Sequence, residues 1–332
     1  MIPPESHTLF RELCAGSQRF VLTTHMNPDG DALGSQAGLA RFLLAQGKQV
    51  RIVNQDPTPA LLRFLGDDDY PVETYDPATH DPLLGESDLI ILVDNAAPDR
   101  MGRMESIMRA RAEHTLCIDH HPSRKTPWSR QILDESACAT AIMIYELVRD
   151  CGWTLDRKAA EAIYVGLATD TGFFRFNSVD ARAHSIAAEL LRAGANPARV
   201  YRAIYERNSV AFTQLLGHAL ADVRVFGRGS IASVRLTAEL IEELDAAEVD
   251  TSEIMTALLA MDGICVALLF RELAGKQVKV SLRSKGELDV HSLANEFGGG
   301  GHRNASGIVL DGELDAVARL ITERATLLSS SA

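Results

Sequence analysis

The sequence has few cysteines, few aromatic residues and no long apolar run. Its five cysteines, among 332 residues, are widely spaced and include no CxxC pair, which argues against a disulfide framework or a thiolate zinc site. The longest apolar runs, Leu89–Val93 and Ile264–Phe270, are far shorter than the roughly 20 residues of a membrane helix. The N-terminus also lacks the basic and apolar segments of a signal peptide. We therefore expect a cytoplasmic protein with reduced thiols and no membrane partner.

Basic residues are also outnumbered, with 33 Lys and Arg against 45 Asp and Glu, which gives a net charge of −12. Affinity for long duplex nucleic acid depends largely on neutralising phosphates with basic side chains. The charge therefore disfavours long duplexes as partners, although a small anion could still bind locally. Because domains usually span about 100 to 200 residues, the length favours two domains.

The first part of the chain has the pattern of a parallel α/β sheet. Four apolar segments predict strands separated by crossovers: Phe20–Thr24, Val50–Val53, Leu89–Val93 and Thr115–Ile118. Periodicity predicts helices at Ala32–Gln46, Ala137–Arg149, Asp156–Ala168, Ala181–Arg192 and Val200–Leu216. We expect a sheet flanked by helices over residues 1–195, followed by a helical linker over residues 196–220.

Strands replace helices from about Asp222 onward. The predicted strands are Val223–Phe226, Ser230–Leu236, Val266–Phe270 and Val278–Leu282. Glycine-containing turns separate them at Gly227–Gly229 and Ala274–Lys276. These segments predict a second, smaller α/β domain over residues 221–332.

Potential metal ligands follow three of the strands in the first domain. They are His25, Asp29 and Asp31 after the first, Asp94 after the third, and Asp119, His120 and His121 after the fourth. The carboxyl ends of strands form the ligand-binding edge of open α/β sheets. Each cluster alone could be an ordinary polar loop or helix cap, but three such coincidences are much less common.

Asp170 is a fourth acid of interest, since it follows a predicted helix and lies before a glycine, where a capping role is the alternative. Together with the clusters above it gives six carboxylates and imidazoles, which suit Mn²⁺ or Mg²⁺ rather than a structural zinc site. Six such groups can hold two ions that share one carboxylate, an arrangement used in phosphoryl displacement.

A glycine run in the second domain, Gly298–Gly301, is followed at once by His302 and Arg303. Such a run could be a flexible surface loop. Alternatively, its backbone N–H groups could cradle a phosphate, with the two following side chains adding positive charge.

These residues resemble the motifs of a known family. The ordered set His25-x₃-Asp29-x-Asp31, Asp94, Asp119-His120-His121 and Asp170 is similar to the four motifs of the DHH phosphoesterases. Gly299–His302 resembles the Gly-Gly-Gly-His motif of the DHHA1 domain. The resemblance covers nearly the whole chain. It implies a DHH catalytic domain over 1–195, a DHHA1 substrate-binding domain over 221–332, and an active site in the cleft between them.

The resemblance also implies two Mn²⁺ ions, with Mg²⁺ as the alternative. One would be held by His25, Asp29 and Asp94, and the other by Asp31, Asp94, His120 and Asp170, so that Asp94 bridges. A hydroxide held between the ions would attack the phosphate, near which His121 would act with Asp119 as its orienting partner. The substrate-binding residues would be Arg175, Arg283, Gly299, Gly300, Gly301, His302, Arg303, Asn304 and Ser306. Arg283 could instead be a solvated strand-end arginine.

The compact acidic chain is most similar to the nanoRNase and pAp-phosphatase group of this family. That resemblance implies hydrolysis of short oligoribonucleotides, including dinucleotides such as pGpG and pApA, and conversion of pAp to AMP. A cyclic-dinucleotide phosphodiesterase, a RecJ-like single-strand exonuclease and a non-catalytic nucleotide sensor are the alternatives. The expected partners are short oligoribonucleotides or small nucleotides, and a homodimer is compatible with the resemblance.

Overall fold

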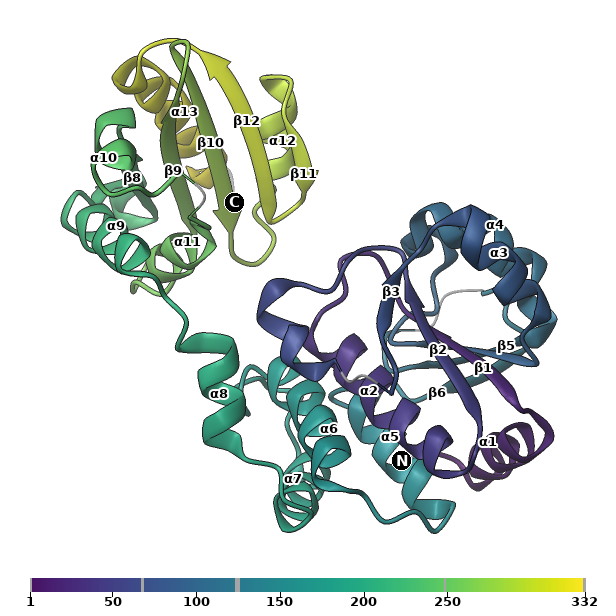
Figure 1. The fold of residues 1–332 in the computed structure, drawn as a ribbon. Coiled ribbons are helices and arrows are strands. Elements are labelled where there is room, and N and C mark those ends of the chain that lie inside the picture. The colour runs from purple at the N-terminus through teal and green to yellow at the C-terminus, as the bar shows by residue number, and fades with distance from the viewer. Residues whose placement is uncertain (1, 67–68, 123–125, 248, 331–332) are drawn as a thin grey trace. The chain divides into compact units, whose positions relative to one another are not determined.

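The computed structural model describes residues 2–66, 69–122, 126–247 and 249–330 of the chain (Figure 1). It divides into two compact units, Met1–Arg207 and Asn208–Ala332, each built around one six-stranded sheet. The division falls within residues 196–220, the stretch predicted as a helical linker. The predicted α/β fold class is confirmed.

The sheet of the first unit is parallel throughout, with the strand order β3-β2-β1-β4-β5-β6. Its strands are β1 (Arg19–Thr23), β2 (Gln49–Asn54), β3 (Val72–Thr74), β4 (Leu89–Val93), β5 (Thr115–Asp119) and β6 (Arg130–Leu133). The four predicted strands correspond to β1, β2, β4 and β5. The edge strands β3 and β6 were not predicted because they are short and mostly half-buried, so they lack the apolar run of the central strands.

The side chains of β4 alternate between two cores, one on each face of this sheet. Leu89, Ile91 and Val93 belong to the core shared with the helices of one face, whereas Ile90 and Leu92 belong to the core of the other face. The first face is covered by α1 (Pro4–Gly16), α2 (Gly30–Ala45), α5 (Thr140–Asp150), α6 (Arg157–Asp170) and α7 (Ala181–Arg192). The second is covered by α3 (Pro77–Glu86), α4 (Glu105–Ala110) and the 3-10 segment η2 (Pro98–Met104) (Figure 1).

Glycines allow α2 and α6 to pack with their backbones almost in contact. A Cβ atom on Gly34 of α2 would lie 2.4 Å from the carbonyl oxygen of Ala162 on α6. A Cβ atom on Gly166 of α6 would lie 2.8 Å from a carboxylate oxygen of Asp31 on α2. This close approach brings the start of α2 beside the end of α6, and both helix ends carry acids.

The helix predicted over Val200–Leu216 is wrong as one element, since the structure contains two. They are α8 (Pro197–Tyr205), which packs on the first unit, and α9 (Val210–Ala221), which packs on the second. The side chain of Ser209 accepts a hydrogen bond from the backbone N–H of Phe212 and so caps a new helix. This capping signal outweighs the continuous apolar periodicity.

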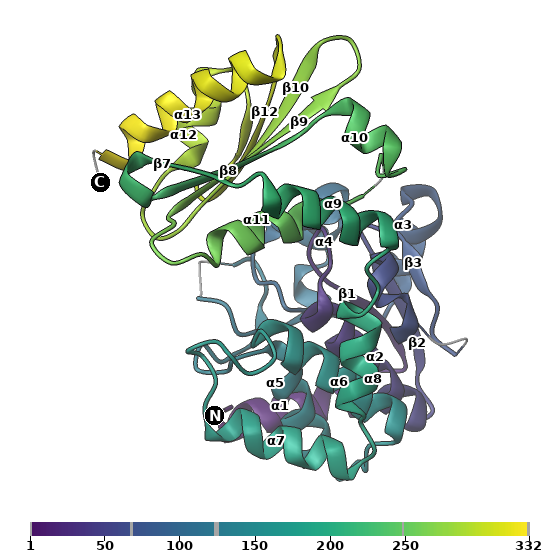
Figure 2. The same cartoon turned by 90° about the vertical axis from the view of Figure 1, so that its left-hand side faces the viewer.

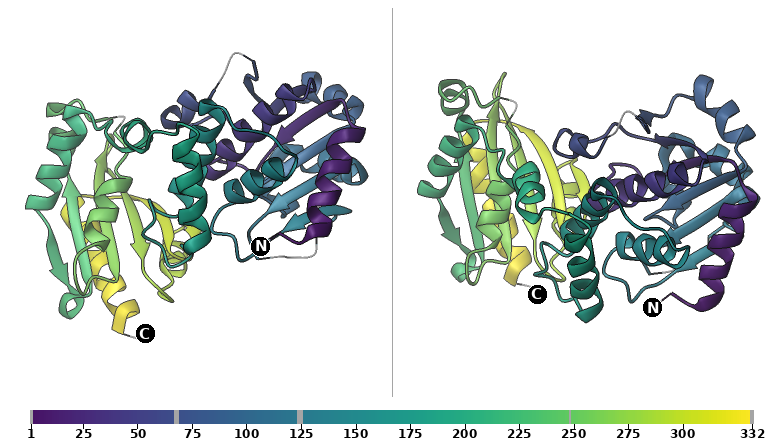
Figure 3. Two further views of the ribbon diagram at one scale, coloured as in Figure 1. Left: turned by 90° about the horizontal axis from the view of Figure 1, so that it is seen from below. Right: turned by 60° about the horizontal axis from the view of Figure 1, so that its bottom comes forward.

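The sheet of the second unit has the order β11-β12-β10-β9-β8-β7 and is antiparallel except for the β8–β9 pair. Its strands are β7 (Arg224–Phe226), β8 (Ile231–Leu236), β9 (Val266–Leu273), β10 (Gln277–Ser284), β11 (Gly300–His302) and β12 (Ala305–Asp311). The helices α12 (Val290–Glu296) and α13 (Leu314–Ser330) cover one face, and α9, α10 (Ala238–Glu243) and α11 (Ser252–Leu259) cover part of the other (Figure 2). Figure 3 draws this unit, in green to yellow, from two further directions. Among the described residues, no helix is long and apolar enough to span a membrane.

Candidate metal centre

All six predicted metal ligands lie around one edge of the first sheet, where the adjacent strands β1, β4 and β5 end. They are His25 after β1, Asp29 and Asp31 at the start of α2, Asp94 after β4, His120 after β5, and Asp170 at the end of α6. The parallel topology therefore brings together side chains that are up to 145 positions apart in the sequence (170 − 25).

The first group of ligand atoms belongs to His25, Asp29 and Asp94, and all of these atoms lie within 4.8 Å of one another. Nε2 of His25 is 3.4 Å from Asp94 Oδ2 and 3.9 Å from Asp29 Oδ2. The other ring nitrogen, Nδ1, donates to the carbonyl oxygen of Met26 at 2.7 Å, which leaves Nε2 as the acceptor. This buried Nε2 has no hydrogen-bond partner among the described residues. A buried acceptor without a donor is costly, and a bound cation would satisfy it.

The second group consists of Asp31, His120 and Asp170. Nε2 of His120 lies 3.3 Å from Asp170 Oδ2 and 4.0 Å from Asp31 Oδ2. Nδ1 of the same ring donates to the carbonyl oxygen of Ala137 at 3.0 Å. As with His25, this hydrogen bond fixes the tautomer and directs the acceptor nitrogen towards the carboxylates.

Asp94 faces both groups with different oxygen atoms. Its Oδ2 faces His25, while its Oδ1 lies 3.6 Å from Nε2 of His120 and accepts a hydrogen bond from the Thr140 hydroxyl at 2.9 Å. The backbone of Asp94 is left-handed, with φ of +59°, a conformation that costs on the order of 1 kcal/mol or more in a residue other than glycine. Strain of this kind is often concentrated at functional sites. Sequence reasoning missed Thr140, because nothing local distinguishes it from an ordinary residue at the start of a helix.

The acids at the start of α2 are held by backbone N–H groups. Both carboxylate oxygens of Asp31 accept hydrogen bonds at the N-terminus of α5, from the amides of Thr140 at 2.6 Å and Ala141 at 2.8 Å. Asp29 caps α2 with Oδ1, while its Oδ2 faces His25. The capping role considered for this acid and a ligand role are therefore compatible, since each uses a different oxygen.

The electrostatics of the cluster favour a bound cation. Burial raises the pKa of Asp31 well above its usual value, and the nearby carboxylates of Asp94 and Asp170 raise it further. Burial and the neighbouring Asp29 likewise raise the pKa of Asp94, and burial raises the pKa of Asp170. Closely spaced, desolvated carboxylates destabilise one another unless positive charge compensates them. The donor set of carboxylates and imidazoles fits Mn²⁺ or Mg²⁺.

His121 lies beside the metal candidates and is held by Asp119. Nδ1 of His121 is 2.8 Å from Asp119 Oδ1, and this hydrogen bond raises the pKa of His121. Burial acts to raise the pKa of Asp119, but the hydrogen bonds from the side chain and backbone of His121 outweigh burial and lower it. The nearby charge of Arg100, a residue that sequence reasoning missed, acts to lower the pKa of His121.

Arg175 follows Asp170 closely in the sequence but is fixed by a local contact. Its Nε donates to the carbonyl oxygen of Gly172 at 2.7 Å. The preceding Phe173 and Phe174 both have positive φ angles and pack against other aromatic rings, including Tyr201 and His184 respectively. Binding of substrate by Arg175 remains a prediction.

The second half of the glycine run, Gly300 and Gly301, belongs to an edge strand, so this part of the run is not the loop considered above. Strand β11 pairs with β12 through Gly300↔Gly307, Gly301↔Ser306 and His302↔Ala305. A Cβ atom on Gly299 would lie 2.3 Å from the carbonyl oxygen of Gly307, and one on Gly301 would lie 2.4 Å from that of Ala305. Glycine is therefore needed for the backbones to approach, whatever else the segment binds.

Three of the predicted substrate-binding residues in this hairpin have structural partners. The side-chain NH₂ of Asn304 lies within hydrogen-bond distance of the Ser284 hydroxyl at the end of β10 and of two carbonyl oxygens in the loop before α12. The hydroxyl of Ser306 donates to the carbonyl oxygen of His302 at 2.9 Å. Arg303 forms an ion pair with Glu287 at 2.6 Å. These contacts shape the hairpin, and a direct role in binding remains a prediction for all three.

Arg283 and His302 share one row of the second sheet. The register pairs His302 with Ala305, and Ala305 with Arg283, so the row crosses β11, β12 and β10. Directly paired residues project to the same face of a sheet. His302 is exposed and Arg283 is half-buried, and between them lies only the small side chain of Ala305.

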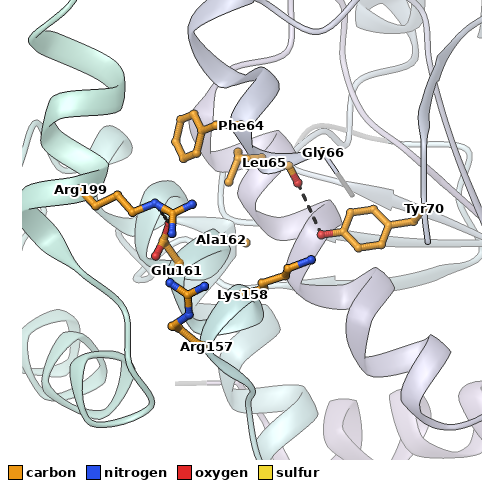
Figure 4. Close-up of a pocket in the computed structure, with 9 residues that line it drawn as sticks. All are labelled: Phe64, Leu65, Gly66, Tyr70, Arg157, Lys158, Glu161, Ala162 and Arg199. Atoms are coloured by element: carbon orange, nitrogen blue, oxygen red, sulfur yellow. Dashed lines mark hydrogen bonds and ion pairs between the residues drawn. The ribbon is translucent and has the colours of Figure 1, made fainter. Parts of the chain in front are cut away.

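A separate cavity, shown in Figure 4, lies at the N-terminal end of α6. Arg199 and Glu161 form an ion pair there at 3.1 Å, and the hydroxyl of Tyr70 donates to the carbonyl oxygen of Leu65 at 3.5 Å. Asp170 is at the opposite end of this 14-residue helix, about 20 Å away at a rise of about 1.5 Å per residue. The residues that line this cavity include none of the candidate ligands, so we place the functional site at the C-terminal end of α6.

The parallel sheet whose edge gathers acids and histidines is consistent with a phosphoester-hydrolysing protein of the DHH class. Residues 19–167 match the DHH family N-terminal domain, and residues 230–327 match the DHHA1 domain. The chain therefore belongs to the DHH/DHHA1 family of phosphoesterases.

Particular relatives cover most of the chain. It is 32% identical over 307 residues to the bifunctional oligoribonuclease and PAP phosphatase NrnA of Thermus thermophilus, and the match covers 91% of this chain and 87% of that relative. It is 31% identical over 291 residues to the protein of the same name from Bacillus subtilis, with 86% and 88% covered. Among solved structures, an exopolyphosphatase-related protein from Bacteroides fragilis has a TM-score of 0.83 and 29% identity, with 99% of both chains covered.

Proposed function

We propose that the protein hydrolyses short oligoribonucleotides, including dinucleotides such as pGpG and pApA, and converts pAp to AMP, in a reaction that depends on Mn²⁺ or Mg²⁺. The main support is the two ligand groups, both of which Asp94 faces, together with relatives that are named as oligoribonuclease and PAP phosphatase. The net charge of −12 is consistent with small anionic substrates rather than long duplexes.

In this proposal two ions would be held, one by His25, Asp29 and Asp94 and the other by Asp31, Asp94, His120 and Asp170. When bound, such ions supply positive charge that activates water and stabilises the phosphoryl oxygens. The chain itself orients the ligands. The amides of α5 and the Thr140 hydroxyl hold two of the buried carboxylates, and backbone carbonyls fix both imidazoles.

His121 is the proposed proton-transfer group. Because Nδ1 is engaged by Asp119, Nε2 is the nitrogen that can exchange a proton with the substrate. The raised pKa of His121 favours the protonated ring, which can donate that proton to the leaving oxygen. Asp119 then acts as a positioning residue, since it fixes the ring and stabilises its charge.

The second unit is the proposed source of further substrate contacts. The row that contains His302 and Arg283 offers two basic side chains on one face of the sheet, one exposed and one half-buried, and such a pair suits a phosphate or a carboxylate. The side chain of His302 has no hydrogen bond or ion pair with any described residue, and that of Arg283 donates one hydrogen bond, to the carbonyl oxygen of Leu282 at 3.2 Å.

The test is hydrolysis by the purified protein with Mn²⁺ of RNAs from two to five nucleotides, pAp, cyclic-di-AMP and a long single strand. The matched variants are Asp94→Asn, which alters the shared ligand, and Asp262→Asn, which alters an exposed aspartate of the second unit. Turnover of the short RNAs and pAp, lost in Asp94→Asn and kept in Asp262→Asn, supports the proposal. Preference for cyclic-di-AMP would instead indicate a cyclic-dinucleotide phosphodiesterase, and binding without turnover would indicate a nucleotide sensor.

A further inference from the structure

A cavity in the first unit lies beside the metal candidates. It has a volume of about 290 Å³ and is lined by residues 95–97, 99 and 100 after β4 and by Asp119, His121 and Pro122 at the end of β5. None of the six metal candidates, all of which are among the described residues, lines it. The volume is near the lower end of the roughly 300 to 1,000 Å³ of small-molecule sites, which suits one small group rather than a polymer. The cavity thus adjoins the proposed centre through His121.

Arg100 is the basic residue of this cavity besides His121. It is exposed, and its guanidinium has no hydrogen bond or ion pair with any residue that the structure describes. The remaining charged groups of the lining are the carboxylates of Asp99 and Asp119, and Asp119 is already engaged by His121. A guanidinium without a carboxylate partner presents a planar set of donors that suits a phosphate.

The backbone around Arg100 is anchored to the ligand loop. The carbonyl oxygen of Arg100 accepts a hydrogen bond from the N–H of Met26 at 2.8 Å, next to His25. Two residues further on, Gly102 has φ of +55°, and a Cβ atom there would lie 2.9 Å from the sulfur of Met26. The position of Arg100 relative to the metal candidates is therefore set by backbone contacts, while its side chain is available.

We propose that Arg100 binds a second phosphate of the substrate, next to the one that is cleaved. This inference rests on the proposed function. In the proposed function the scissile phosphate lies against the metal candidates and His121, whereas the cavity with Arg100 is lined by His121 and by none of the six metal candidates. A substrate group in this cavity is therefore the neighbour of the scissile phosphate. The guanidinium of Arg100 favours a negative charge on that neighbouring group. Substrates with an adjacent phosphate are favoured over those without one.

The test compares adenosine 3′,5′-bisphosphate with adenosine 3′-monophosphate, which share the scissile phosphate and differ in the second one. In Arg100→Gln we expect the kcat/KM ratio of bisphosphate to monophosphate to fall about 10- to 100-fold, the range for lost hydrogen bonds between charged groups. Arg100→Lys keeps a positive charge but loses the planar set of donors, so its kcat/KM ratio should lie between those of the wild type and Arg100→Gln. Arg109→Gln is the matched control, because Arg109 lies on the following helix α4 and is half exposed in an ion pair with Glu105.

An unchanged ratio in Arg100→Gln would overturn the inference, and so would an equal loss for both nucleotides, which would place Arg100 at the scissile phosphate. Thermal unfolding checks that the variant is folded. If the wild-type protein hydrolyses neither nucleotide, nor pApA, the proposed function fails. The ratio of dissociation constants for the two nucleotides, measured with wild type and Arg100→Gln, then decides the inference separately.

Discussion

Asp94→Asn should stabilise the metal-free protein and at the same time remove its stabilisation by Mn²⁺. The side chain of Asp94 is only 3% exposed, and burial raises its pKa well above the usual value. For an acid with a raised pKa in the folded state, stability is lost as the pH rises from the unfolded value through the folded one, so the charge is destabilising at neutral pH. Asparagine has the same shape, tolerates the left-handed backbone and can still accept from Thr140.

The magnitude follows from removal of one uncompensated buried charge, about 1 to 3 kcal/mol. At roughly 2 to 4 °C per kcal/mol for a unit of this size, the Tm of the first unit should rise by about 2 to 12 °C in EDTA. For the wild type, Mn²⁺ at about 100 times its Kd should contribute roughly 2.7 kcal/mol, whereas most of this gain should be absent in the variant.

Scanning calorimetry in EDTA and in Mn²⁺ measures both effects. The control is Asp99→Asn, an exposed aspartate in the segment after β4, for which both Tm values should match the wild type. A variant that melts below the wild type in EDTA, yet still gains the full Mn²⁺ shift, would refute the assignment of Asp94 as the shared ligand.

Three further predictions concern other parts of the first unit. Thr140→Val removes the hydrogen bond to Asp94 and should lower kcat about tenfold with little change in KM, whereas Thr140→Ser should retain activity. The measurement is steady-state kinetics on pAp, and equal kcat values for Thr140→Val and Thr140→Ser would contradict the role of this hydrogen bond. Gly34→Ala places a methyl group against the backbone of α6 and should cost about 1 to 3 kcal/mol in urea unfolding. Gly85→Ala is the control, because its Cβ atom would meet no atom within 4 Å, and it should be neutral or slightly stabilising. An equal loss of unfolding free energy in the two variants would contradict the packing argument. Arg182→Met breaks ion pairs with Asp134 at 2.7 Å and Glu146 at 2.6 Å, with Arg182 only 13% exposed, and should destabilise the unit by about 3 kcal/mol. The pKa of Asp134 is lowered to about 2, because the hydrogen bonds from Ser136 and Arg182 outweigh burial. Its contribution should therefore persist at neutral pH and disappear only as the pH falls below about 4, and a variant as stable as the wild type at pH 7 would show that the pairs contribute nothing.

The sequence predicted the central part of the fold because each central strand is a continuous apolar run. Leu89–Val93 matches β4 residue for residue, because a strand that is buried on both faces is apolar along its whole length and ends where the apolar run ends. The edge strands β3 and β6 lack such a run. The glycine strand β11 could not be predicted, because its pairing depends on close backbone contact with β12 rather than on side chains.

Most of the candidate ligands could be found from the sequence because they follow strands, whose ends the topology brings together, whereas Asp170 ends the helix α6. Their supporting contacts could not. Thr140 lies 46 positions from Asp94, and their contact depends on how α5 meets the edge of the sheet. Arg100 lies in a 3-10 segment whose path is set by Gly102 and Met26, which no periodic pattern indicates.

Several of the candidate ligand side chains are held by hydrogen bonds with the protein itself. Asp31 is held by the amides of α5, and His25 and His120 are held by backbone carbonyls, so folding alone orders these side chains. If the centre binds a metal as proposed, the ion would enter a site whose side chains are already held in place, and it would act as a reversible cofactor rather than as a structural metal. Little conformational entropy remains to be lost when it binds, and little would be released when it leaves. A cell could therefore exchange one divalent ion for another in this protein without unfolding it.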